Sequence, residues 1–108
     1  MIATGDYNDV PDSATYRIWL DAGFADAHAL AECSDDAAES YTNHGWRGYP
    51  FARDDDTPQR IDWIMLRDGA STTTSVLSCE IVRDGGPKVW PSDHFPVVVE
   101  LDVGASPK

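Results

Sequence analysis

The sequence predicts an α+β fold in which a single clear helix backs a mainly antiparallel sheet. Three observations lead to this prediction. One amphipathic segment with helical spacing follows a short apolar segment at the start of the chain. Several short segments rich in apolar and β-branched residues come after it, and residues typical of turns separate them. A chain of 108 residues fits one domain, so we assign residues 1–108 to a single unit.

The first predicted strand covers residues 1–5 and leads into a loop that begins at Asp6. A helix is predicted over about 13–23, because Asp12 or Ser13 can cap its first turn and Gly23 can follow its last. Its core-facing side is expected to carry three large apolar side chains, Tyr16, Trp19 and Leu20.

The middle of the chain is harder to assign. Phe24 to His28 is expected to return toward the core, whereas 29–40 is Ala-rich and acidic and fits either a short helix or a surface excursion. Residues 41–46 fit a strand or a loop, and 53–59, with three successive Asp residues, fits a solvated loop.

Three strands are predicted in the second half of the chain, over 61–66, 75–82 and 95–101, with Gly85-Gly86-Pro87 as a turn after the second. In the first and last of these strands apolar residues point to both faces. Strands of this kind are normally covered on both sides. Only one helix is obvious, so the sheet is expected to need a second covering layer.

Charge is the most informative property of the composition. The 19 acidic residues outnumber the 8 basic ones, giving a formal net charge of −11. Proteins that bind duplex nucleic acid tightly usually carry the opposite charge, since Lys and Arg neutralise phosphates. The sequence therefore disfavours tight, sequence-independent DNA binding, although a bound divalent cation could still bring a phosphate to an acidic site.

Composition and hydropathy are typical of a soluble globular protein. Cys33 and Cys79 are too few and too far apart for a zinc site or a disulfide framework, so two reduced thiols are expected. No apolar run is long enough to suggest a membrane span. Met1 to Thr4 lacks the features of a signal peptide, which predicts a cytoplasmic location if the chain is complete as given.

Two segments carry carboxylates in positions that chemistry could use. Asp6 and Asn8 lie on the loop after the first strand, where they could converge on one site or simply stabilise a turn. Asp62 lies within an apolar strand, where an unpaired carboxylate is costly, so it needs a partner such as a histidine or a cation unless it faces solvent at an edge.

The segment Ser92-Asp93-His94 precedes the last strand. A turn with a solvated imidazole would explain it. Together with Asp62, however, Asp93 and His94 supply an Asp–His pair and a spare carboxylate for a metal ion.

The three segments Gly5-Asp6-Tyr7-Asn8, Arg60-Ile61-Asp62-Trp63-Ile64 and Ser92-Asp93-His94-Phe95-Pro96-Val97 resemble motifs of the endonuclease/exonuclease/phosphatase superfamily. They occur in the order found in the C-terminal half of that domain, and the resemblance covers about residues 2–102. A weaker likeness places Thr42 to Trp46 beside a motif of some bacterial members, which implies that His44 either lines the substrate pocket or caps a turn. The superfamily fold is a four-layer α/β/β/α sandwich, so the chain is expected to form its C-terminal half.

The resemblance implies metal-dependent hydrolysis of phosphate esters with Mg²⁺ or Mn²⁺ as cofactor. It implies that Asp93 binds the metal, directly or through water, and that Asp6 holds and deprotonates the attacking water. Asn8 would orient that water or bind a phosphoryl oxygen. The resemblance thus implies that Asn8 and His44 are substrate-binding residues. Asp62 would orient His94, which acts as general acid, or as general base in some family mechanisms. These residues are therefore expected at one end of the sheet, with Asp62 and His94 roughly 2.6–3.2 Å apart.

Motifs of the N-terminal half, including a metal-binding Glu, do not occur in this sequence. Activity is therefore expected to require that half or a partner chain. The alternative is a non-catalytic remnant that associates with itself or with another protein. In either case an apolar sheet face is expected to be covered by the missing half or by a second copy, through Ile64, Leu66, Val97 and Val99.

Overall fold

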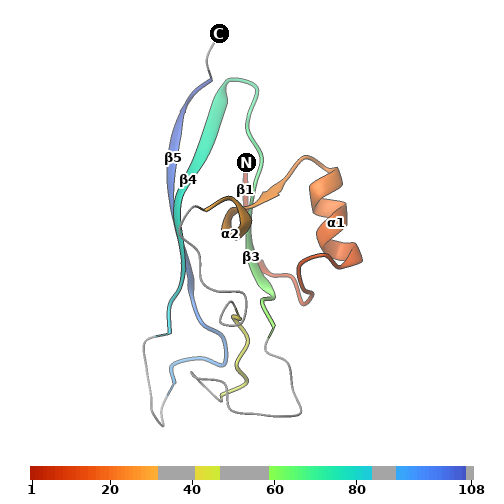
Figure 1. Cartoon of the computed structure of the whole chain (residues 1–108), viewed down its shortest axis with the longest axis vertical. Coiled ribbons are helices and arrows are strands. Elements are labelled where there is room, and N and C mark those ends of the chain that lie inside the picture. The colour runs from red at the N-terminus through yellow and green to blue at the C-terminus, as the bar shows by residue number, and fades with distance from the viewer. Residues whose placement is uncertain (32–40, 47–58, 84–89, 107–108) are drawn as a thin grey trace.

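The computed structural model describes residues 1–31, 41–46, 59–83 and 90–106. Five strands and two helices form in these ranges: β1 (Ile2–Asp6), α1 (Ala14–Asp21), β2 (Ala25–Asp26), α2 (Ala27–Leu30), β3 (Asp62–Leu66), β4 (Thr72–Ile81) and β5 (Val97–Ala105). The α+β prediction is confirmed. In Figure 1 the helix α1 lies on one side of β1 and β3, and the long β4–β5 ribbon lies on the other.

All strand pairs are antiparallel, as predicted, but hydrogen bonds divide the described strands into two sheets. One sheet has the order β1-β3-β2, and the other contains β4 and β5. The two sheets are connected near Asn43, which forms isolated bridges with Gln59 and with His94. A loop segment, and not a strand, therefore joins the start of β3 to the residues that lead into β5.

Helix α1 has the capping residues that the sequence predicts. The Ser13 hydroxyl accepts a hydrogen bond from the Tyr16 backbone N–H at 3.2 Å. At the other end Phe24 N–H donates to the Trp19 carbonyl, and Gly23, with φ of +88°, donates to Leu20. This pair of bonds is a Schellman motif, whose left-handed residue favours glycine. The helix is shorter than predicted because both caps act within the expected range.

We expect Ser13→Ala to lower the free energy of unfolding by about 1 kcal/mol, since it removes the acceptor for an otherwise unpaired helix N–H. Urea unfolding followed by circular dichroism measures this loss. Ser13→Thr, which keeps the hydroxyl, is the matched control and should remain close to the wild type. Equal stability of the alanine and threonine variants would contradict a capping role.

The first core cluster lies between α1 and β3. It consists of four buried side chains, Tyr16, Phe24, Trp63 and Met65. Aromatic rings meet there edge to face, with 5.1 Å between the centroids of Tyr16 and Trp63. The expectation that Leu20 shares this face is wrong, because Leu20 is 42% exposed. The short helix has room for only one buried residue, Tyr16, with Trp19 packed beside the cluster.

The opposite face of β3 is partly covered by α2, which packs against both β3 and β4. Leu66, expected on an open apolar face, is only 5% exposed, so that part of the prediction is wrong. The other three residues of the expected face are half-buried: Ile64, Val97 and Val99. A second core cluster, Tyr41, Ile81 and Phe95, forms below them with Trp90 packed against it.

The ribbon strands are longer than predicted. β4 begins at Thr72 and β5 continues to Ala105, because antiparallel pairing extends through polar Thr and Ser residues that have no apolar signal. Cys79 is buried. Predictions for Cys33, for most of 29–40, for the acidic loop up to residue 58 and for the turn at Gly85 lie outside the described residues.

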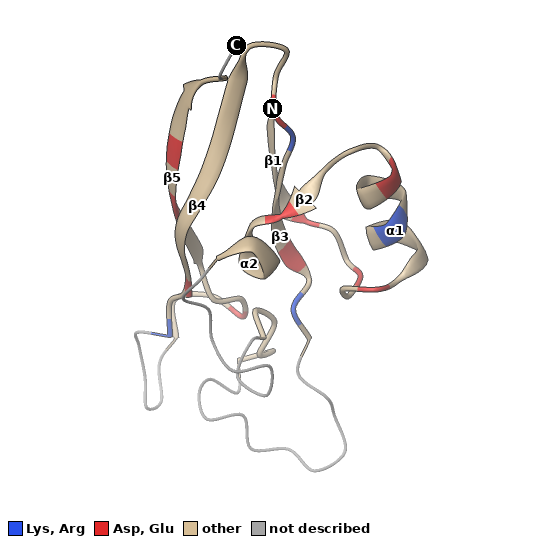
Figure 2. Cartoon of the chain, turned by 45° about the horizontal axis from the view of Figure 1, so that its top comes forward, with Lys and Arg blue, Asp and Glu red and all other residues tan. Residues whose placement is uncertain are grey.

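Acidic residues occur in several elements, as Figure 2 shows for β2, β3, β5 and α1, while basic residues are few. Among the described helices none is long and apolar enough to cross a membrane.

Candidate active site

An aspartate–histidine pair joins the two sheets. The Oδ2 atom of Asp62, at the start of β3, lies 2.7 Å from Nδ1 of His94, which precedes β5. The side chains are 22% and 27% exposed, respectively, so solvent reaches the pair without surrounding it. A carboxylate only accepts, so Nδ1 donates and the opposite nitrogen, Nε2, is left as the ring's second site for proton exchange. The predicted contact is confirmed.

The environment of His94 favours its protonated form. Burial alone lowers the pKa of this imidazole. The hydrogen bond to Asp62, together with the negative charges of Asp62 and Asp93, outweighs burial and raises the pKa above its ordinary value. His94 is also held through its backbone, because its N–H donates to the Ser92 hydroxyl at 3.1 Å.

Asp6 is brought to the same place by the pairing of β1 with β3, in which Asp6 lies opposite Asp62. Ligand atoms of Asp6, Asp62 and His94 all lie within 4.8 Å of one another. Two residues later, Asn8 adopts a left-handed backbone with φ of +54°, and its N–H donates to Oδ1 of Asp6 at 2.8 Å. This hydrogen bond holds the Asp6 carboxylate beside the Asp62–His94 pair.

Asp93 directly precedes His94 in the chain. Among the described residues, however, its carboxylate does not belong to the cluster of ligand atoms formed by Asp6, Asp62 and His94. Its backbone carbonyl accepts hydrogen bonds from the N–H groups of His44 and Gly45, at 2.9 and 3.1 Å. Its negative charge acts on both His44 and His94. The predicted role of Asp93 as a metal ligand remains a prediction.

A partly open cleft of about 360 Å³ lies beside Asp6 and Asp62. Asp6 and Asp62 line it together with apolar side chains of β3 and of the entry to β5, among them Ile64, Phe95 and Val97. The cleft lies between the two sheets, so a molecule bound there would contact carboxylates from β1 and β3.

His44 is buried, with 1% of its surface exposed, and its ring stacks on Phe95 at 4.2 Å between centroids. Burial lowers the pKa of His44, opposed by a hydrogen bond with the Ser92 backbone and by the charge of Asp93. In the structure His44 is therefore a buried residue that packs against Phe95. Its predicted contact with substrate remains a prediction.

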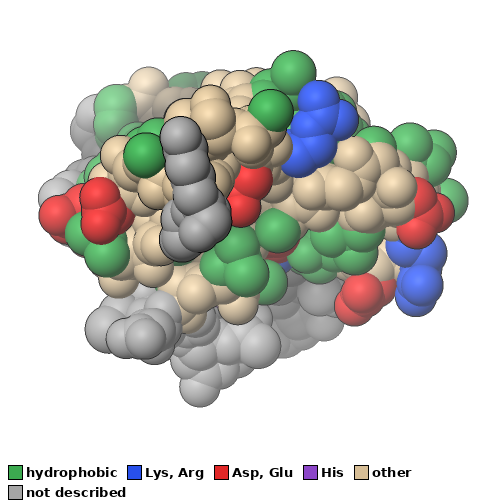
Figure 3. Space-filling model, turned by 90° about the horizontal axis from the view of Figure 1, so that it is seen from above, with side chains coloured by type: hydrophobic (Ala, Val, Ile, Leu, Met, Phe, Trp, Pro, Cys, Tyr) green, Lys and Arg blue, Asp and Glu red, His purple; other side chains and the backbone are tan. Residues whose placement is uncertain are grey.

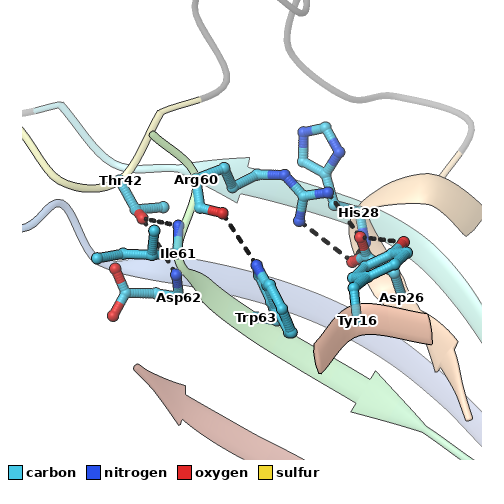
Figure 4. A network of polar contacts seen from close by, with 8 residues as sticks. All are labelled: Tyr16, Asp26, His28, Thr42, Arg60, Ile61, Asp62 and Trp63. Carbon is cyan, nitrogen blue, oxygen red and sulfur yellow. Dashed lines mark hydrogen bonds and ion pairs between the residues drawn. The ribbon is translucent and has the colours of Figure 1, made fainter. Parts of the chain in front are cut away.

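A buried polar network lies beside β3 (Figure 4). Arg60 donates to both carboxylate oxygens of Asp26, at 3.3 and 2.6 Å, and the Tyr16 hydroxyl donates to the same carboxylate at 2.9 Å. Burial and the negative charge of Asp26 raise the pKa of Tyr16 to about 12. No local sequence pattern predicts this network, because its members lie far apart in the chain.

Comparison with known proteins identifies the family of the chain. The model of the Endonuclease/Exonuclease/phosphatase family matches residues 1–94, and the chain belongs to that family. No curated protein sequence is significantly similar to it.

Three solved structures share the fold. A mannosyl-6-phosphatase from Bacteroides thetaiotaomicron is 25% identical with a TM-score of 0.72, over 94% of this chain and 37% of that one. A second family protein from the same organism is 26% identical with a TM-score of 0.69, over 94% and 36% of the two chains. A family protein from Leptotrichia buccalis, 23% identical with a TM-score of 0.68, covers the same shares and shows the fold alone. The chain thus spans little more than a third of their length and forms part of that domain.

Proposed function

We propose that this chain supplies catalytic residues for metal-dependent hydrolysis of phosphate esters. The observation that carries the proposal is the 2.7 Å contact between Asp62 and His94, with the Asp6 carboxylate beside it at the edge of a cleft. Family membership supports the same reaction class. An oriented imidazole next to a second carboxylate provides one group to accept a proton and one to donate a proton, as hydrolysis requires.

The donor atoms fit a hard divalent cation in part. Carboxylate oxygens suit Mg²⁺ or Mn²⁺. One oxygen of Asp62 already accepts the His94 hydrogen bond, and Asp6 is assigned to the attacking water, which leaves Asp93, the residue before His94, as the carboxylate that would hold the ion. A bound ion would polarise the phosphoryl group and stabilise negative charge that develops on it.

In the proposed reaction the Asp6 carboxylate accepts a proton from a water molecule as the water oxygen attacks phosphorus. Asn8 orients that water or binds a phosphoryl oxygen. The bond between phosphorus and the ester oxygen breaks, and His94 delivers a proton to the leaving oxygen. Asp62 keeps Nδ1 of His94 protonated, so that the opposite nitrogen faces the reaction. Some family mechanisms would make His94 the base instead.

The chain's charge bears on its substrate. A net charge of −11 opposes close approach of a polyanionic duplex, which favours a small phosphate ester or a lipid headgroup over nucleic acid. The mannosyl-6-phosphatase among the similar structures is named for a sugar phosphate, in agreement with this preference. We therefore place nuclease activity on long DNA below hydrolysis of small phosphate esters, including the phosphodiesters of small molecules and lipid headgroups.

Activity is proposed to need the rest of the domain fold, or a second copy of the chain. The chain spans 37% of the first similar structure, and its cleft is only partly enclosed. Large apolar side chains are exposed on the described surface, including Ile2, Leu77, Val98 and Val103. Hydrophobic side chains are visible among neutral and charged ones in Figure 3. A two-stranded ribbon such as β4–β5 is also marginally stable unless another layer packs on it.

The test is an assay of phosphate release with Mg²⁺, with Mn²⁺ and with EDTA. Small phosphomonoesters, phosphodiesters and duplex DNA serve as alternative substrates. The chain is assayed alone and together with a polypeptide that supplies the remaining part of the fold. We expect little turnover by the chain alone, and metal-dependent turnover of small esters in the mixture.

Complete absence of turnover in the mixture, with binding of the two polypeptides demonstrated, would favour a non-catalytic module. Strong turnover by the chain alone, abolished in His94→Ala, would show instead that the chain or its dimer completes the site.

A further inference from the structure

Thr42 connects the two members of the Asp62–His94 pair. Its side chain is fully buried, with 0% of its surface exposed. The Oγ1 atom accepts hydrogen bonds from the backbone N–H groups of Ile61 and Asp62, at 3.0 and 3.2 Å (Figure 4). One hydroxyl thus receives both amides at the point where β3 begins.

The backbone of Thr42 reaches the other member of the pair. Its carbonyl accepts a hydrogen bond from Phe95 N–H at 2.7 Å, directly after His94, and its own N–H donates to the Gln59 carbonyl at 3.0 Å. The next residue, Asn43, bridges Gln59 and His94. A single buried residue is therefore bonded to the segments on each side of the contact.

This connection matters because β3 and β5 belong to different sheets. Strand pairing fixes Asp62 relative to β1, and fixes β5 relative to β4, but neither pairing fixes Asp62 relative to His94. An imidazole is oriented only if its carboxylate partner is held at hydrogen-bonding distance. Within the described residues, Thr42 is bonded to the backbone on both sides of this gap.

We infer that Thr42 is a positioning residue, whose hydroxyl holds the Asp62 backbone so that the carboxylate orients His94. The inference adds to the proposed function a residue that contacts no reacting atom. Its functional meaning rests on the proposed role of the Asp62–His94 pair, but its geometry can be tested without turnover.

The test compares Thr42→Val, which keeps the side-chain shape and loses the acceptor, with Thr42→Ser, which keeps the acceptor. The first measurement is amide hydrogen exchange at Ile61 and Asp62 by NMR. We expect exchange at both amides to be about 2- to 10-fold faster in the valine variant and near the wild-type rate in the serine variant, as loss of one hydrogen bond implies.

The second measurement is the tautomer of the neutral His94 ring, read from its nitrogen chemical shifts. The wild type and Thr42→Ser should hold the proton on Nδ1, whereas Thr42→Val should move part of it to Nε2. Asp62→Asn provides the reference spectrum for a ring without its carboxylate partner. A purely structural threonine would alter stability without changing this tautomer.

Wild-type exchange rates and an unchanged His94 tautomer in a folded Thr42→Val chain would overturn the inference. If Thr42→Val does not fold, amide hydrogen exchange in the wild-type chain still tests the inference. Protection of the Ile61 and Asp62 amides equal to that of the β3 interior supports the inference, and exchange at the rate of an open chain refutes it. Neither result depends on activity, so failure of the positioning role is distinguishable from failure of the proposed function.

Discussion

His94→Ala should lower metal-dependent phosphate release by the complemented chain by about 10²- to 10⁴-fold, the usual contribution of a positioned acid or base. The imidazole lies 2.7 Å from Asp62 and has a raised pKa, so it can supply a proton that water supplies poorly at neutral pH. The effect should appear in kcat, because the proton moves in the transition state. Steady-state kinetics on a small phosphate ester measure it.

Asp62→Asn tests the same pair from its other side. Removing the partner of an oriented imidazole typically costs about 10- to 100-fold in metal sites, so we expect a smaller loss than for His94→Ala. Asp102→Asn is the matched control, because it removes the same charge from an exposed residue of β5 that pairs with Ser75. Equal losses in the two asparagine variants would assign the effect to net charge and contradict the pair's role.

The contact between Asp62 and His94 was predictable because burial makes an isolated carboxylate expensive. Asp62 is the one charged residue in a run of apolar ones, and only a few side chains could neutralise it. His94, from a motif of the same family, was the matching candidate. Capping of α1 by Ser13 was predictable for a similar reason, since the unpaired amides of a helix end need local acceptors.

Other contacts between distant segments were not predictable. Thr42 bonds to residues about 20 positions away, and the Asp26–Arg60 pair spans 34 positions, without a periodic or compositional signal for either. The burial of Leu66, which pairs with Ala25 of β2, was likewise not evident from its own strand. Strand periodicity gives the face of a residue but does not say what covers that face.

Asp26→Asn should lower the free energy of unfolding by about 3–5 kcal/mol, the usual cost of leaving one member of a buried ion pair without its partner. Only 1% of the Asp26 side chain and 11% of the Arg60 side chain are exposed. Asparagine keeps the shape but loses the charge that offsets desolvation of the guanidinium. Typical domains are stable by about 5–15 kcal/mol, so much of the chain's stability would be lost. Urea unfolding followed by tryptophan fluorescence, at one protein concentration, measures the change.

Two controls separate the ion pair from general effects of substitution. Asp21→Asn removes the same charge from an exposed residue at the end of α1 and should stay within about 0.5 kcal/mol of the wild type. The double variant Asp26→Leu with Arg60→Met removes both charges, so no buried ion is left unpaired, and it should be more stable than Asp26→Asn alone. A double variant that is less stable than Asp26→Asn would mean that the network stabilises β3 mainly through its hydrogen bonds to Tyr16 and to the His28 backbone.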